Sequence, residues 1–228
     1  DVKKFVFTST SSVYGNGHEP PINEDVHKQP LTSYGGSKLM IEYILTDYYK
    51  AYGLNSVTLR LFNVCGADPE HTLGEVKNAP THLIPSVMDT ALGRRDIFKI
   101  FGTKYNTRDG TAIRDYTHVW DVAKAFSNAI SMLDEKDGNY VFNIGAGRGF
   151  SVKQVLNAME KALGKAIPIS EESRREGDPS HVSADVSLAE KHLNWTPSNS
   201  NIDKICQDTV NWLNSEAYNK IDLTKVPQ

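Results

Sequence analysis

The chain has little cysteine and no excess of positive charge. Its 228 residues include only Cys65 and Cys206, which lie far apart and form no Cys-x-x-Cys arrangement. A disulfide framework is therefore not expected, and a reducing compartment is the simpler environment. The net charge of −3 argues against a nucleic-acid partner, because such proteins present a concentrated basic patch. The longest basic clusters are only pairs, such as Arg94-Arg95 and Arg174-Arg175.

Patterns typical of metal sites and membrane spans are also lacking. The seven histidines are scattered, with no His-Glu-x-x-His spacing, so we expect no bound metal. No apolar run approaches the roughly 20 residues that cross a bilayer, and no charged-then-apolar leader is present. With 39% hydrophobic and 23% charged residues, the composition is that of an ordinary globular protein. We expect a cytoplasmic protein without a membrane partner.

The first sixty residues have the pattern of a strand, a helix and a second strand. Residues 2–8 are rich in β-branched and aromatic side chains, and residues 56–62 read as a buried strand. Between them, Thr32 or Ser33 can cap a helix that runs to about Tyr52 and is closed by Gly53. This spacing predicts a βαβ unit of a parallel sheet. Further helices are expected at about 81–93, 119–133, 151–163 and 201–215, and strands at 97–101, 140–144 and 167–169.

No glycine-rich dinucleotide loop follows the first strand, although a doubly wound sheet is normally entered through one. We therefore expect that the front of such a sheet lies outside this sequence. Gly145-Ala146-Gly147 is similar to the loop, but Phe150 stands where the third glycine of Gly-x-Gly-x-x-Gly would fall. A structural turn is the better interpretation there, and His118 is likewise expected to be a buried, hydrogen-bonded histidine rather than a catalytic base.

Tyr34 and Lys38 stand four residues apart at the start of the predicted helix. Residues with this spacing share one helix face, and an ammonium beside a phenol favours the phenolate, a suitable general base. Most Tyr-x-x-x-Lys pairs are simply solvated. Here, however, the preceding strand ends in five consecutive hydroxyl residues, 8–12, and carboxyl ends of parallel strands line the ligand crevice of such sheets. We expect the hydroxyl run and the Tyr-Lys pair to meet there.

Several longer stretches resemble the extended short-chain dehydrogenase/reductase superfamily and, more narrowly, the UDP-glucose 4-epimerases. The stretch from Gly93 to Asp121 is the most specific, and the others are FVFTSTSSVYG (5–15), SYGGSKLMIEYIL (33–45), LRLFNVCGA (59–67), THLIP (81–85), FNIGAGRGFSV (142–152) and RREGDPSHVSAD (174–185). The resemblance implies an α/β fold: the C-terminal portion of a Rossmann-type parallel sheet plus a smaller α/β substrate-binding domain. It implies a partial dinucleotide-binding domain at 1–65 and a mainly UDP-sugar-binding domain at 66–228, with segments around 115–145 returning to the sheet.

The resemblance also implies roles for individual residues. Tyr34, Lys38 and Thr10 match the family's catalytic residues, and the same three together with Phe62 match its NAD contacts. The substrate-binding positions correspond to Ser11, Ser12, Asn63, His82, Leu83, Lys99, Ile100, Phe101, Arg114, Arg175, Asp178 and Val182. Arg114, Arg175 and Asp178 correspond to the residues that clamp the phosphates and the uridine ribose. Without the resemblance, a surface charge cluster would be the preferred interpretation of Arg174-Arg175.

The function implied is the interconversion of UDP-galactose and UDP-glucose through transient NAD-dependent oxidation at C4. Related 4,6-dehydratases carry Asp-Glu after the catalytic Thr, whereas Ser11 and Ser12 stand here, so epimerisation is favoured over elimination. Val182 matches a gatekeeper beside the sugar, and a small residue there leaves UDP-N-acetylhexosamines open as substrates. UDP-pentoses are a further alternative. An inactive or incomplete fragment that retains at most UDP-sugar binding is the other alternative. The family forms homodimers, which the sequence leaves open for this chain.

Overall fold

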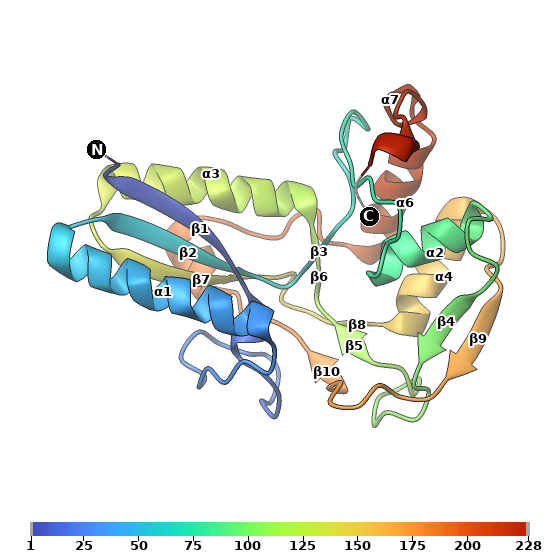
Figure 1. The fold of residues 1–228 in the computed structure, drawn as a ribbon, viewed down its shortest axis with the longest axis horizontal. Helices are drawn as coiled ribbons and strands as arrows, with labels where there is room; N and C mark the ends of the chain where they lie inside the picture. The colour runs from blue at the N-terminus through green and yellow to red at the C-terminus, as the bar shows by residue number, and fades with distance from the viewer. Residues whose placement is uncertain (1, 227–228) are drawn as a thin grey trace.

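The computed structural model describes residues 2–226, and the part at the left of Figure 1 is built on a parallel three-stranded sheet. The strand order is β1-β2-β7, and the strands are β1 (Lys4–Thr10), β2 (Asn55–Leu61) and β7 (Asn139–Ile144). Helices α1 (Ser33–Tyr52) and α3 (Val119–Glu135) cover its two faces. Because both faces are covered, the middle strand β2 is buried from Ser56 to Arg60. The predicted βαβ unit is confirmed.

Helix α1 begins and ends at the residues that its sequence signals predicted. The Thr32 hydroxyl accepts a hydrogen bond from the Gly35 amide at 3.1 Å, and Gly53 closes the helix at φ +67°. Leu39, Glu42 and Leu45 are buried and recur every three residues, so one face of the helix lies against the sheet.

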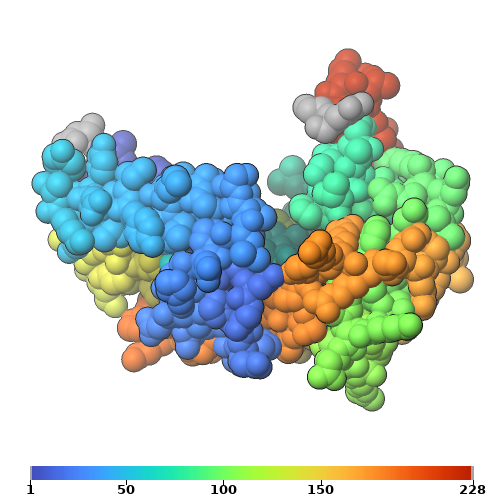
Figure 2. Space-filling model, turned by 60° about the horizontal axis from the view of Figure 1, so that its bottom comes forward, coloured from blue at the N-terminus to red at the C-terminus, as the bar shows by residue number. Residues whose placement is uncertain are grey.

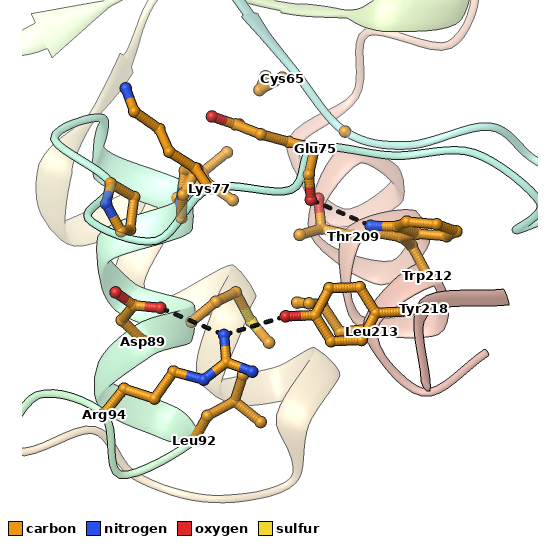
Figure 3. Close-up of a pocket in the computed structure, with 15 residues that line it drawn as sticks. Cys65, Glu75, Lys77, Asp89, Leu92, Arg94, Thr209, Trp212, Leu213 and Tyr218 are labelled. Atoms are coloured by element: carbon orange, nitrogen blue, oxygen red, sulfur yellow. Dashed lines mark hydrogen bonds and ion pairs between the residues drawn. The ribbon is translucent and has the colours of Figure 1, made fainter. Parts of the chain in front are cut away.

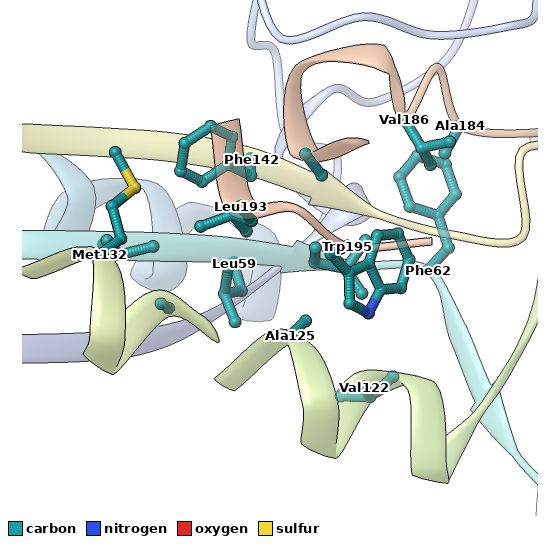
Figure 4. Close-up of a cluster of buried hydrophobic side chains, with 14 of the residues drawn as sticks. Leu59, Phe62, Val122, Ala125, Met132, Phe142, Ala184, Val186, Leu193 and Trp195 are labelled. Atoms are coloured by element: carbon teal, nitrogen blue, oxygen red, sulfur yellow. The ribbon is translucent and has the colours of Figure 1, made fainter. Parts of the chain in front are cut away.

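Apolar packing on both sides of the sheet forms the first hydrophobic core. Leu59 of β2 points toward α3, where Val122 and Ala125 lie, whereas Phe142 of β7 lies beside Leu193 of α5 (Ser187–Leu193) (Figure 4). Residues 184–195 thus contribute to this core, a return that the sequence prediction did not include.

A second core forms around the parallel pair β4–β9 and three helices. Its elements are β4 (Phe98–Phe101), β9 (Ile169–Glu172), α2 (Leu83–Ala91), α4 (Val152–Leu163) and α6 (Ile202–Leu213). The predicted strand at 167–169 was wrong in position. Pairing with β4 runs from Ile169 to Glu172, and Pro168, which has no amide hydrogen to donate, only precedes the strand.

Very short strands connect the regions of the two cores, and the sequence did not predict them. β3 (Asn63–Cys65) pairs with β6 (Tyr116–His118), and β5 (Ile113–Arg114) lies between β8 (Phe150–Ser151) and β10 (His181–Val182). The remaining elements are α7 (Glu216–Asn219) and single 3-10 turns at Ser11–Val13 and Leu223–Lys225. The fold is α/β with parallel strands, as predicted, while the domain division at residue 65 stays a prediction. No helix within residues 2–226 is long and apolar enough to cross a membrane.

Candidate functional site

Tyr34 and Lys38 lie on one face of the first turns of α1, as their spacing predicted. The Lys38 Nζ atom is 5.7 Å from the centre of the Tyr34 ring and 5.0 Å from that of Phe7. It donates a hydrogen bond of 2.9 Å to the Thr8 carbonyl of β1. The ammonium is therefore held at the strand, and Tyr34, with 54% of its surface exposed, faces solvent beside it.

The predicted hydroxyl run lies directly against the start of α1. Thr10 ends β1 and caps the following 3-10 turn, its Oγ1 accepting from the Ser12 amide at 3.2 Å. A Cβ on Gly35 would come within 2.7 Å of the Ser12 carbonyl oxygen, so only glycine permits this close approach. The glycine next to Tyr34 thus brings the phenol-bearing helix start onto the turn that carries Thr10, Ser11 and Ser12.

Beneath this pair lies a buried polar network that the sequence interpretation missed. Arg60 of β2 contacts Glu42 of α1 through two hydrogen bonds, Nη2 to Oε2 at 2.6 Å and Nε to Oε1 at 3.1 Å. Ser9 of β1 also donates to Glu42, and Arg60 donates to the Tyr14 hydroxyl at 2.9 Å. Burial raises the pKa of Tyr14 to about 12, so the phenol stays neutral. A glutamate four residues after Lys38, on the same helix face, was the available signal.

A second cluster joins Arg114, Asp178 and Tyr105. One carboxylate oxygen of Asp178 accepts from Arg114 Nη2, and the other accepts from the Tyr105 hydroxyl at 3.1 Å. Nearby, the Arg175 guanidinium lies 4.0 Å from the centre of the Phe101 ring. Val182 pairs with Arg114 in the β10–β5 ladder. The structure therefore brings together six residues of this region, five of which were predicted, while Tyr105 was not.

Asp115 connects several predicted positions and was also missed. Its backbone carbonyl accepts from the Asn63 amide at 3.0 Å, and its carboxylate accepts from the amides of Ala146 and Ala184. A Cβ on Gly145 would come within 2.7 Å of that carboxylate, which explains the glycine. The Gly145-Ala146-Gly147 segment is thus a structural turn, as predicted. Burial outweighs the hydrogen bonds and raises the pKa of Asp115 to about 6.

The other predicted positions are more scattered. Phe62, just after β2, is buried in the first core, and Ile100 of β4 is buried in the second, so a ligand could meet Ile100 only through its backbone. Lys99 forms an ion pair of 3.5 Å with Glu172. His82 and Leu83 lie at the N-terminus of α2. The ligand roles of all these residues stay predictions.

His118 is a buried structural residue, as the sequence indicated. Its Nδ1 accepts from the Trp120 amide at 3.0 Å, its Nε2 lies 3.1 Å from an Asp208 oxygen, and burial lowers its pKa. Within residues 2–226, no three His, Cys, Asp or Glu side chains are grouped as metal ligands.

The surface has a hollow and a separate cavity, and they lie differently with respect to the predicted site residues. Figure 2 shows a hollow between the part coloured blue to cyan, which holds β1 and α1, and the part coloured green and orange, which holds β4 and β9. A separate cavity lies between α2, α6 and α7, where Arg94 sits between Asp89 and Tyr218 (Figure 3). None of the predicted site residues lines that cavity.

Comparison with known proteins identifies the family. The family model described as "NAD dependent epimerase/dehydratase family" matches residues 1–145, more than half of the chain. The chain belongs to this family. It is 42% identical over 211 residues to a UDP-glucose 4-epimerase of Azospirillum brasilense, covering 92% of this chain and 61% of the relative. It is 43% identical over 222 residues to the enzyme of that name from Dictyostelium discoideum, covering 95% of this chain and 64% of the relative.

Solved structures of family members superimpose closely. UDP-glucose 4-epimerase from Stenotrophomonas maltophila, solved with NAD and formylated UDP-arabinopyranose, matches with a TM-score of 0.90 and 34% identity over 95% of this chain and 65% of that one. The UDP-Glc/GlcNAc 4-epimerase of Campylobacter jejuni matches with a TM-score of 0.79 and 40% identity over 92% of this chain and 64% of that one. The chain spans 61–64% of the length of the curated relatives it matches.

Proposed function

We propose that this chain carries the catalytic and UDP-sugar-binding residues of a UDP-glucose 4-epimerase, which interconverts UDP-galactose and UDP-glucose. The observation that supports this most is the placement of Tyr34 beside Lys38, against the turn that begins at Thr10. The similarity to UDP-glucose 4-epimerases over more than nine-tenths of the chain supports the same activity.

In this proposal Tyr34 takes the proton from the C4 hydroxyl of the hexose and later returns it. Lys38 places its ammonium 5.7 Å from the centre of the Tyr34 ring. Thr10 hydrogen-bonds the same sugar hydroxyl and orients it toward Tyr34. Ser11 and Ser12 supply hydroxyls but no carboxyl, so the site has no acid–base pair there for eliminating water, and epimerisation is favoured within a family that also includes dehydratases.

NAD is the proposed cofactor, and the residues present fit it. Tyr34, Lys38, Thr10 and Phe62 lie at the carboxyl ends of β1 and β2 or beside them, where open α/β sheets hold dinucleotides. When bound, NAD supplies the oxidation and re-reduction at C4. Lys38 would contact the nicotinamide ribose, and the Phe62 backbone would contact the nicotinamide.

The UDP moiety is proposed to bind at the end of the site that holds Arg114 and Arg175. Arg114 and Arg175 offer planar guanidinium donors that suit diphosphate oxygens, with Asn63 adding an amide. Phe101 and the β4 backbone at Lys99 and Ile100 would border the uracil, with His82 and Leu83 near the nucleotide. Asp178 would accept from the ribose hydroxyls.

The test is a sample of the purified chain incubated with NAD and UDP-galactose. We expect UDP-glucose to form in the wild-type chain and not in Tyr34→Phe. A second candidate function is UDP-sugar binding without turnover. It is favoured by the contrast between Tyr34, which is more than half exposed, and the Arg114–Asp178–Tyr105 cluster, which is already assembled. UDP binding without bound NAD and without conversion would support this second function.

We propose that the substrate range also includes UDP-hexoses that carry an N-acetyl group. Val182 is smaller than the Tyr that narrow family members carry, and one similar structure is a UDP-Glc/GlcNAc 4-epimerase. UDP-pentoses stay open as well, since another similar structure holds a UDP-arabinopyranose derivative. Val182→Tyr should abolish turnover of UDP-GlcNAc and spare UDP-glucose, and equal loss of both would contradict this range.

We further propose a cytoplasmic homodimer. Both cysteines are free, which suits a reducing compartment. Met40, Ile44 and Tyr48 of α1 are at least half exposed, an apolar face that a second copy could cover. Light scattering should give twice the monomer mass for the wild-type chain. In Ile44→Glu the measured mass should fall to that of the monomer.

A further inference from the structure

Two consecutive arginines lie over two aromatic rings in the nucleotide end of the proposed site. The Arg175 guanidinium is 4.0 Å from the centre of Phe101, and the Arg174 guanidinium is 4.7 Å from the centre of Tyr105. Gly102 permits this arrangement, because it has φ +86° and a Cβ there would lie 2.5 Å from the Tyr105 ring. Phe101 and Arg175 already have proposed ligand roles, whereas Tyr105 and Arg174 do not.

Both unassigned residues contact Asp178. The Tyr105 side chain is 5% exposed, and its hydroxyl donates to Asp178 Oδ2 at 3.1 Å. Arg174 Nη2 donates to the backbone carbonyl of Asp178 at 2.8 Å. Asp178 is thus held at its side chain by Tyr105 and at its backbone by Arg174, while Arg174 in turn stacks on Tyr105. Arg114 occupies the other carboxylate oxygen.

This arrangement leaves Asp178 with free acceptor capacity in a fixed direction. A carboxylate has about four lone-pair sites, and Arg114 and Tyr105 use two of them. The remaining sites can accept from the hydroxyl groups of a ligand without any rearrangement of the carboxylate. Hydroxyl donors rather than anions suit these sites, because only lone pairs are left on a negatively charged group.

We infer that Tyr105 and Arg174 are positioning residues that orient Asp178 toward the ribose hydroxyls, and that they thereby determine the preference of the site for ribonucleotides. The inference rests on the proposed function, because it takes a UDP-sugar as the ligand. It adds a specificity role for two residues to which the proposed function assigns no ligand contact.

The experiment measures the affinities of UDP, 2′-deoxy-UDP and 3′-deoxy-UDP by calorimetry. Tyr105→Phe removes the hydroxyl and keeps the ring under Arg174, and Tyr105→Leu removes both. Wild type should bind at least one deoxy analogue about tenfold more weakly than UDP, as expected for a lost hydrogen bond to a charged group. In Tyr105→Phe this ratio should fall to within about threefold, because the carboxylate is no longer fixed.

Tyr218→Phe is the matched control. Like Tyr105, Tyr218 is a buried tyrosine with an arginine over its ring, the Arg94 guanidinium lying 5.9 Å from the ring centre. Its hydroxyl accepts a hydrogen bond of 3.0 Å from Arg94 Nη1. Tyr218 contributes to the separate cavity of Figure 3 rather than to the Asp178 cluster. A general loss of stability would affect both variants, whereas a change in the ratio of affinities is expected only for Tyr105→Phe.

Each outcome has a distinct meaning. If wild type binds UDP and Tyr105→Phe keeps the full discrimination against both deoxy analogues, the inference is overturned and the proposed function stands. If wild type binds no UDP, the proposed function itself is overturned, together with this inference. Should both Tyr105 variants fail to fold, Arg174→Gln serves instead, because the Arg174 side chain is exposed. An unchanged ratio in that variant would also overturn the inference.

Discussion

The two ends of the proposed site are built in different ways. The reactive end (Tyr34, Lys38 and Thr10) comes from one strand and the helix that follows it. The nucleotide end (Phe101, Tyr105, Arg114, Arg175 and Asp178) comes from three separate segments whose side chains hold one another in place. The position of the reactive groups therefore depends on the local βα unit and its buried support, whereas the position of the nucleotide-binding groups depends on long-range pairing.

Loss of the Tyr34 hydroxyl should give the largest difference between the two ends, because it should lower turnover and leave UDP affinity unchanged. Tyr34→Phe removes the proposed base and keeps the ring beside Lys38, so turnover should fall by about 10²–10⁴-fold. UDP affinity should stay unchanged, because the nucleotide end is not touched. Initial rates of UDP-galactose conversion and calorimetry with UDP measure the two effects. Tyr140→Phe, which loses only a hydrogen bond to the Asp137 carbonyl, is the control and should change neither quantity.

Breaking the buried Glu42–Arg60 pair should destabilise the fold beneath the reactive end. Glu42→Ala leaves Arg60 buried without its partner, which should lower the free energy of unfolding by about 3–5 kcal/mol. Asp134→Asn breaks the exposed Lys4–Asp134 ion pair and should cost at most about 1 kcal/mol. Urea unfolding at neutral pH measures both. Similar small losses in the two variants would show that the Glu42–Arg60 pair does not support α1.

Removal of Arg175 should affect the nucleotide end alone. Arg175→Ala should weaken UDP binding by about tenfold or more, because a charge-assisted contact to phosphate is lost. The midpoint of unfolding should stay near that of wild type, since Arg175 is exposed. Arg94→Ala, which removes an arginine from the cavity of Figure 3, should leave UDP affinity unchanged. Equal loss in the two variants would mean that UDP does not bind near Phe101.

Asp115 should contribute a term to the stability that depends on pH. Its pKa is about 6 in the folded chain against 3.8 as the ordinary value, so the protonated group stabilises the fold at low pH. This contribution is lost as the pH rises through 6, and it amounts to about 2 kcal/mol between about pH 4.5 and pH 6.5. Asp115→Asn should lack this slope. Urea unfolding of both proteins at the two pH values tests it, and parallel pH dependences would contradict the raised pKa.

The sequence predicted those elements whose signals are local. The capping residue Thr32, the closing Gly53 and the spacing of Tyr34 and Lys38 lie within one helix, so α1 and the reactive pair could be placed before the structure was known. The boundaries of β1 were less accurate. The first strand was expected at residues 2–8, but its pairing with β2 runs from Lys4 to Thr10.

Features that depend on long-range contacts could not be predicted in the same way. Strands of two or three residues, such as β5 and β10, exist only because distant segments meet, and no local pattern marks them. Tyr105 and Asp115 are single residues in an ordinary context. The two backbone amides that donate to the Asp115 carboxylate lie 31 and 69 positions away, and the Asp178 carboxylate that accepts from Tyr105 lies 73 positions away. Arg114, Arg175 and Asp178 could be named only through the resemblance to a family.

The most direct test of the account is the conversion of UDP-galactose by the purified chain supplied with NAD, followed by nuclear magnetic resonance of the sugar. We expect UDP-glucose to appear in the wild-type sample and not in the Tyr34→Phe sample, while both proteins bind UDP equally. Absence of UDP-glucose from the wild-type sample, despite UDP binding, would contradict the claim that the two ends form one epimerase site.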